Sequence, residues 1–186
     1  MVDTDPTWLN AENQSPHSIQ ERPLTLRAAT LWPFVLAVYN APQAKTYCLK
    51  LQNEAHMDVC LLLWRLWLYA YHRMSNAEAA PLISAHHHWQ HRYTTPLRSL
   101  RQRVKPWTKT GARPWYNALL HTELIAERTA LLQLAQGSTK GAIVKLASQR
   151  QAELSVLHAY PALSRECHTA LMQLIIITDD VRITSL

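Results

Sequence analysis

Residues 59–71 read VCLLLWRLWLYAY, and this stretch decides the fold. Apolar side chains fall on every side of a helix formed there, and a helix that is apolar all round belongs in a protein interior. The stretch is shorter than the roughly 20 residues that a membrane-spanning helix needs, and Arg65 interrupts it. Asp58 precedes it and is a residue type that caps helix N-termini well. We therefore expect a buried central helix at about residues 59–72 and no membrane segment.

The composition around this helix favours helices as well. Only 3 of the 186 residues are glycine, which removes the usual means of building tight hairpins and phosphate-binding loops. Leucine, alanine, glutamine and arginine, which favour helices, are plentiful. We expect an all-α, single-domain bundle of six to eight helices over residues 24–186. Residues 1–23 are polar with several prolines and are predicted to form a disordered amino-terminal arm.

The start of the chain and the cysteines point to the same compartment. The first residues lack the basic and apolar regions of a secretory signal. The three cysteines are widely spaced and form no CxxC motif, which suits buried thiols in a reducing cytoplasm: Cys48, Cys60 and Cys167. The sequence thus predicts a cytoplasmic protein without disulfides.

The positive charge of the chain is concentrated in one segment. No acidic residue lies between Glu78 and Glu123, and seven basic residues do: Arg92, Arg98, Arg101, Arg103, Lys105, Lys109 and Arg113. The rest of the chain holds twelve basic residues against all thirteen acidic ones, so it is close to neutral. Such an asymmetry indicates an anionic partner rather than general solubility.

This basic segment, residues 92–113, is our candidate binding surface. A helix that begins near Pro96 places Arg98, Arg101 and Lys105 close together beside an apolar stripe of Leu97, Leu100 and Val104. The anion-binding candidates are Arg98, Arg101, Arg103, Lys105 and Lys109, with Trp107 as the nearby ring. Nucleic acid or an acidic protein surface would both fit. The competing interpretation is a solvated face in which some cations pair with Glu123, Glu127 or Asp58.

Two histidines suggest a second chemistry. His87 and His91 are four residues apart on a helix, which is the spacing that lets two imidazoles hold one transition metal. A third ligand would have to come from elsewhere, for example Glu123, and HExxH is absent. The alternatives are an exposed polar face and a cluster that gains charge below about pH 6.5.

Glu127 is predicted to be buried, because it falls on the apolar stripe of a long helix at about residues 115–135. A buried carboxylate needs a partner. Arg65, the one charge in the central stretch, and Arg98 are the available partners, and we predict a structural ion pair of Glu127 with Arg65.

Several motifs follow one another along the chain in an order that is typical of a protein family. They are Leu31, Trp32, Phe34, Leu36, Ala37 and Tyr39; Cys48, Leu49, Leu51 and Gln52; Asp58, Val59, Leu61, Leu62, Leu63, Trp67 and Leu68; Pro96, Leu97, Arg98, Leu100 and Arg101; and Glu123, Leu124, Ala126, Glu127 and Arg128. Over about residues 31–135 the chain resembles a proteobacterial family of small helical proteins of unknown function. The resemblance implies a bacterial, cytoplasmic helical protein and no particular activity.

No motif in the sequence identifies a reaction or calls for a cofactor. The leading hypothesis is a non-enzymatic bacterial adaptor or regulator that binds an anionic partner through residues 92–113. One alternative is a metal-dependent enzyme that uses His87, His91 and a carboxylate. Another is a helical subunit of a protein complex, whose apolar faces, including Trp32 and the isoleucines at 175–177, pack on a partner chain.

Overall fold

A computed structural model describes residues 25–71, 73–138 and 143–185. The predicted arm at residues 1–23 lies outside the described residues. The α-helices are α1 Thr25–Asn40, α2 Ala44–Glu54, α3 Val59–Ala70, α4 Ala80–Trp89, α5 Thr95–Val104, α6 Arg113–Ser138, α7 Gln149–His158 and α8 Arg165–Ser185. The all-α prediction is therefore confirmed. No helix in the described ranges combines the length and hydropathy needed to cross a membrane.

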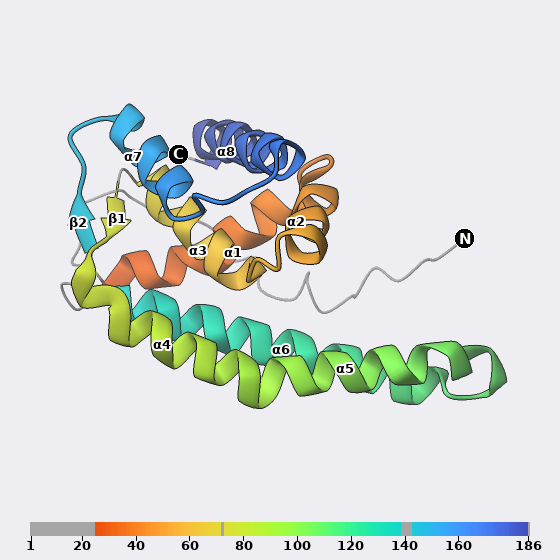
Figure 1. Cartoon of the computed structure of the whole chain (residues 1–186). Coiled ribbons are helices and arrows are strands. Elements are labelled where there is room, and N and C mark those ends of the chain that lie inside the picture. The colour runs from red at the N-terminus through yellow and green to blue at the C-terminus, as the bar shows by residue number, and fades with distance from the viewer. Residues whose placement is uncertain (1–24, 72, 139–142, 186) are drawn as a thin grey trace.

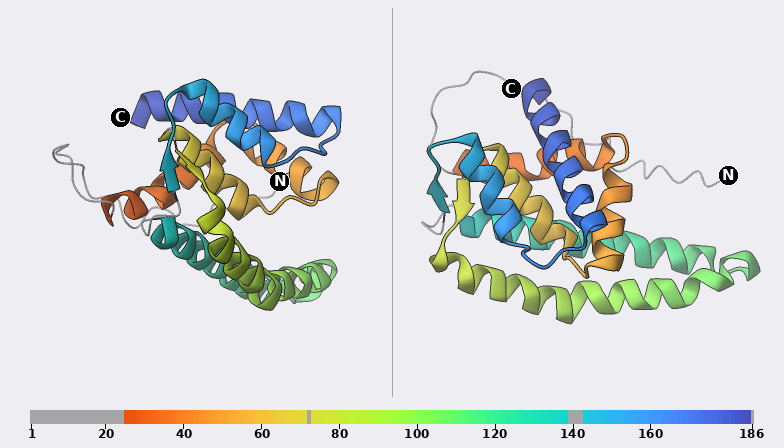
Figure 2. Two further views of the ribbon diagram at one scale, coloured as in Figure 1. Left: turned by 60° about the vertical axis from the view of Figure 1, so that its left-hand side comes forward. Right: turned by 45° about the horizontal axis from the view of Figure 1, so that its top comes forward.

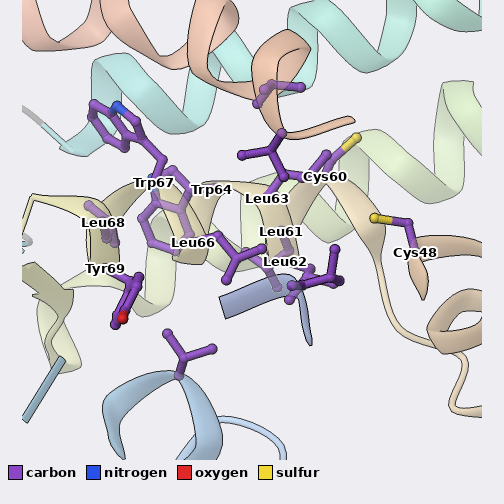
Figure 3. Packing of buried hydrophobic residues seen from close by; sticks show 14 of the residues in the cluster. Cys48, Cys60, Leu61, Leu62, Leu63, Trp64, Leu66, Trp67, Leu68 and Tyr69 are labelled. Atoms are coloured by element: carbon purple, nitrogen blue, oxygen red, sulfur yellow. The ribbon is translucent and has the colours of Figure 1, made fainter. Parts of the chain in front are cut away.

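The central position of α3 is confirmed. It packs against α1, α2, α6, α7 and α8, and its side chains point to all sides into the core (Figure 3). Trp64 is fully buried, and its indole Nε1 donates a hydrogen bond of 2.8 Å to Ser138 Oγ on α6. Asp58 caps α3 as expected, since its Oδ1 accepts from the backbone N–H of Leu61 at 3.0 Å.

The helices form two parts (Figure 1). A long antiparallel hairpin lies along one side, with α4 and α5 on one limb and α6 on the other. The remaining helices gather around α3 on its other side. The far end of the hairpin extends beyond these helices in Figure 1 and in the right-hand view of Figure 2. Gly137 allows the two limbs to approach closely, because a Cβ there would lie 2.4 Å from Leu82 Cδ1 on α4.

The first limb differs from the expectation of a helix that begins near Pro96. A π-helical turn, Gln90–Thr94, joins α4 to α5 without a break. Pro96 has no N–H and its ring crowds the preceding turn. The wider turn, in which Thr95 N–H bonds to Gln90 O, accommodates this proline without ending the helix.

Two short strands were not expected. β1, Arg73–Ser75, pairs antiparallel with β2, Ile143–Lys145, at one end of the bundle. After β2, α7 begins at Gln149 with Ser148 as its N-cap. The isoleucines at 175–177 lie within α8.

Candidate anion-binding arm

The basic segment forms the projecting end of the hairpin. We call this end, residues 90–123, the arm; it is distinct from the amino-terminal segment at residues 1–23. The arm contains the π turn, α5, a 3-10 turn at Lys105–Thr110 and the first part of α6. In the described structure α5 packs on α6 and on the turns that flank it, and no residue of α5 is buried. The arm is therefore only two helices thick, and the apolar core of the bundle does not hold it together.

Ion pairs connect the two helices at the base of the arm. Glu123 on α6 is only 4% exposed, and its Oε1 accepts from Arg98 Nε at 2.9 Å. Arg101 donates from Nε to the second oxygen of Glu123 and from a terminal nitrogen to Tyr116 Oη at 3.3 Å. Arg98 also donates to Glu127. One buried carboxylate thus holds two guanidinium groups of α5 against α6.

This cluster corrects two expectations. Arg98 and Arg101, which were candidates for binding an external anion, are engaged by Glu123 and Glu127, as the competing interpretation stated. The predicted Glu127–Arg65 pair was wrong in its partner, because Glu127 pairs with Arg98. Arg65 points elsewhere, with its guanidinium carbon 5.7 Å from the Tyr160 ring centroid. Hydrophobic periodicity shows that Glu127 lies on a packed face but not which neighbour meets it.

Burial and charge act on this cluster in opposite directions. Burial raises the pKa of Glu127, and neighbouring Glu123 adds to this, while Arg98 only partly opposes it. Burial alone would lower the pKa of Arg98, but its bonds to the two carboxylates raise it overall. The hydrogen bond to Glu123 raises the pKa of Arg101 as well. Both arginines therefore stay charged and paired.

The other cations of the arm are available to a partner. Five are exposed and make no ion pair within the described ranges: Arg92, Arg103, Lys105, Lys109 and Arg113. Arg103, Lys105 and Lys109 were among the predicted anion-binding residues. The structure thus separates the seven cations of the segment into two that hold the arm together and five that face solvent.

Two tryptophans stand at the tip beside these cations. Trp107 is 65% exposed and Trp115 is 73% exposed. The backbone between them is ordered by hydrogen bonds, since Trp107 O accepts from Ala112 N at 3.1 Å and from Thr110 Oγ1 at 3.0 Å. Gly111 closes the turn at φ 106°, a left-handed conformation that glycine adopts without strain. The rings are therefore presented on a defined turn.

An exposed apolar stripe runs from the tip along the first limb. Tyr93 and Leu100, seven residues apart, are 43% and 46% exposed, and Trp107 follows after another seven. Residues at this spacing lie on nearly the same side of a helix. The sequence analysis did not predict this exposed stripe, because it placed Leu100 with Leu97 and Val104 on one apolar face. Their neighbours Leu97 and Val104 are half-buried.

The arm falls within a family match. Residues 30–134 match a family described as a protein of unknown function, DUF2390. The chain belongs to this family. The DUF2390 match covers most of α1, all of α2 to α5 and most of α6, and therefore the whole arm, while β2, α7 and α8 lie outside it. Neither the search of curated proteins nor that of solved structures returned a match to the chain.

The DUF2390 region also contains a buried pair that connects α4 to the core. His86 is 2% exposed, and its Nε2 lies 2.8 Å from Asp58 Oδ2. Burial would raise the pKa of Asp58, but the hydrogen bonds from His86 and from Leu61 N–H outweigh it and lower the pKa. One carboxylate thus caps α3 and holds the hairpin against it.

The Asp58–His86 pair predicts that the stability of the protein depends on pH. The pKa of Asp58 is lower in the folded state than in the unfolded state. The Asp58 carboxylate therefore contributes to the free energy of unfolding above its unfolded pKa of about 3.9, and this contribution is lost as the pH falls through the lower folded pKa. We expect Asp58→Asn to destabilise the protein by about 1–2 kcal/mol at pH 7. Urea denaturation should show this difference narrowing below about pH 4. A difference in the free energy of unfolding between wild type and Asp58→Asn that stays constant from pH 7 to pH 3 would contradict this prediction. Glu78→Gln, at an exposed carboxylate, serves as the control.

The remaining candidate residues are the histidines proposed to bind a metal and the three cysteines. His87 and His91 are exposed. Among the described residues no group of three or more histidine, cysteine or acidic side chains could hold a metal ion. The cysteines are free and buried, and burial raises the pKa of the Cys48 thiol to about 12. Burial raises the pKa of the Cys60 thiol too, so Cys48 and Cys60 have the character of packing residues rather than of nucleophiles.

Proposed function

We propose that this protein is a non-enzymatic bacterial adaptor or regulator of the cytoplasm that binds an anionic partner through the arm. The observation that carries the proposal is the pair of exposed tryptophans at the tip, surrounded by exposed cations without an acidic partner in the described structure. Tryptophan and arginine are the residue types that most often dominate binding energy. Large exposed rings on an ordered, projecting turn favour a binding role over a merely solvated face.

An acidic protein surface is the favoured partner. Tyr93, Leu100 and Trp107 form an apolar stripe at heptad spacing, and such stripes bind apolar grooves of other proteins. Leu100 has no ring on which a base could stack. The exposed cations beside the stripe would complement acidic residues at the rim of such a groove and would mainly speed association.

Single-stranded nucleic acid is the second candidate, and the tip favours it. Trp107 and Trp115 could stack on bases while Lys105, Lys109 and Arg113 contact phosphates, which is the combination that binds single strands with little sequence preference. In both cases the proposed contact residues are Arg103, Lys105, Lys109 and Trp107. Arg98 and Arg101 would act indirectly, by holding the arm together.

Fluorescence anisotropy with labelled single-stranded RNA and duplex DNA tests the second candidate. If it is right, Arg103, Lys105 and Lys109→Gln should lower the slope of log affinity against log salt by about 2, as expected for three lost contacts to single strands. Trp107→Ser with Trp115→Ser should weaken binding by about tenfold or more. The matched control replaces Lys45, Lys145 and Arg165, which are exposed outside the arm, with glutamine. No binding at low salt would exclude nucleic acid.

Co-purification followed by reconstitution tests the favoured candidate. The wild type and the matched control should retain the same partner, and the glutamine and tryptophan variants of the arm should both lose it. The purified partner should then bind the wild type more weakly at higher salt, by at least tenfold between 50 and 500 mM. A partner that both arm variants retain with unchanged affinity would place binding elsewhere and overturn the role of the arm.

A further inference from the structure

The solvent-facing side of α6 carries no acidic residue, lysine or arginine after the first residue of the helix, Arg113. The other charged residues of α6 are buried or half-buried: Glu123, Glu127 and Arg128. Glu123 and Glu127 face α5, and Arg128 lies over the Trp32 ring of α1. A surface helix normally places charged and polar residues on its solvent side. An uncharged face along a 26-residue helix, in a chain of net charge +6, therefore indicates a contact surface.

Six residues of this face form a stripe, which we call the α6 stripe. They are Trp115, Ala118, Thr122, Ile125, Thr129 and Leu132, of which all but the half-buried Thr129 are exposed. Their spacing alternates between three and four residues, as in the seam between two helices of a coiled coil. Both threonine hydroxyls donate hydrogen bonds of 2.9 Å within α6, Thr122 to Ala118 O and Thr129 to Ile125 O. The stripe can therefore be buried without leaving a hydroxyl unpaired.

The α6 stripe is complementary to a second copy of itself that runs antiparallel. In one register each residue of the stripe meets another across the seam: Ile125 meets Thr122, Thr129 meets Ala118, and Leu132 meets Trp115. The six layers extend over about 26 Å, and each of the four central layers pairs a larger side chain with a smaller one. The interface is symmetric, because the same patch serves on both copies. Two uncharged faces also meet without the repulsion that the basic segment would cause.

The area of the stripe is sufficient for a weak specific dimer. The exposed parts of Trp115, Ile125 and Leu132, with their smaller neighbours, correspond to about 500 Å² per copy, or about 1,000 Å² for the pair, the lower limit of specific interfaces. We propose that two copies of this protein form an antiparallel dimer through the α6 stripe. The proposal goes beyond the function proposed above, because the dimer covers Trp115 and leaves Trp107 exposed for a partner.

Sedimentation velocity of the full chain tests the dimer. Between about 1 and 300 μM the average mass should rise from that of one chain toward that of two, as a micromolar dissociation constant requires. Ile125→Glu places a carboxylate in both central layers and should weaken association at least tenfold. The control Leu49→Glu changes a similarly exposed residue of α2 and should leave association unchanged. A chain that stays monomeric over this range, or a dimer that Ile125→Glu leaves intact, would overturn the proposal.

Cysteine cross-linking tests the register. A mixture of Ala118→Cys and Thr129→Cys chains should form a covalent dimer under mild oxidation, because these positions meet across the seam. Each variant alone should cross-link at least tenfold more slowly, and the three native cysteines are buried. Equally fast cross-linking of Ala118→Cys alone would overturn the antiparallel dimer. The glutamine variant of Arg103, Lys105 and Lys109 should dimerise like the wild type, so failure of the dimer and failure of the arm proposal are distinguishable.

Discussion

Glu123→Gln is expected to loosen the arm while the core around α3 stays folded. The substitution keeps the size of the side chain but removes the charge that holds Arg98 and Arg101. Removing one partner of a buried ion pair costs about 3–5 kcal/mol, and we expect about 2–3 kcal/mol here because both arginines are partly exposed and can rehydrate. Because no residue of α5 is buried, little else opposes its separation from α6.

Amide hydrogen exchange is the measurement that resolves this effect. Protection should fall in α5 and in the first part of α6 and should persist in α3, since stability need not be uniform across a structure. Glu127→Gln is the matched control. It should have a smaller effect, because Arg98 would still keep its bond to Glu123. Equal effects of the two substitutions, or loss of protection in α3 as well, would contradict the assignment of Glu123 as the residue that connects the arm.

Trp64→Ala is expected to destabilise the whole domain. Trp64 is fully buried at the centre of α3, and truncating a buried tryptophan typically costs about 3–5 kcal/mol through lost apolar contacts and the cavity that remains. The change also removes the hydrogen bond from Trp64 Nε1 to Ser138 Oγ. Urea denaturation followed by circular dichroism should show a large fall in midpoint with a single cooperative transition.

Trp64→Phe separates packing from hydrogen bonding. Phenylalanine keeps an aromatic ring in the core but cannot donate to Ser138, so the loss should be clearly smaller than for alanine. If alanine and phenylalanine destabilise equally, the hydrogen bond would dominate and the central packing role of α3 would be wrong. This result would leave the arm prediction untouched, since Trp64 and Glu123 lie in different parts of the fold.

Local sequence patterns were sufficient to predict the central helix of the core. The run of apolar residues at 59–71 predicts a buried helix, and Asp58 predicts where it begins, because capping and burial depend on neighbours along the chain. The same patterns misplaced the limb of the hairpin. Pro96 indicated a helix start, but the π turn before it allows the helix to continue, and that turn is stabilised by packing on α6.

The sequence by itself determined an all-α chain with α3 at its centre, a concentration of positive charge in one segment and membership of an uncharacterised family. Only the tertiary structure decided which cations of that segment are free. Arg98 and Arg101 pair with Glu123, while Arg103, Lys105 and Lys109 remain in solvent. The physical reason is that helical periodicity depends on residues a few positions apart, whereas ion pairs join residues 22 to 29 positions apart. Those partners are chosen by the way helices pack, which no local pattern contains.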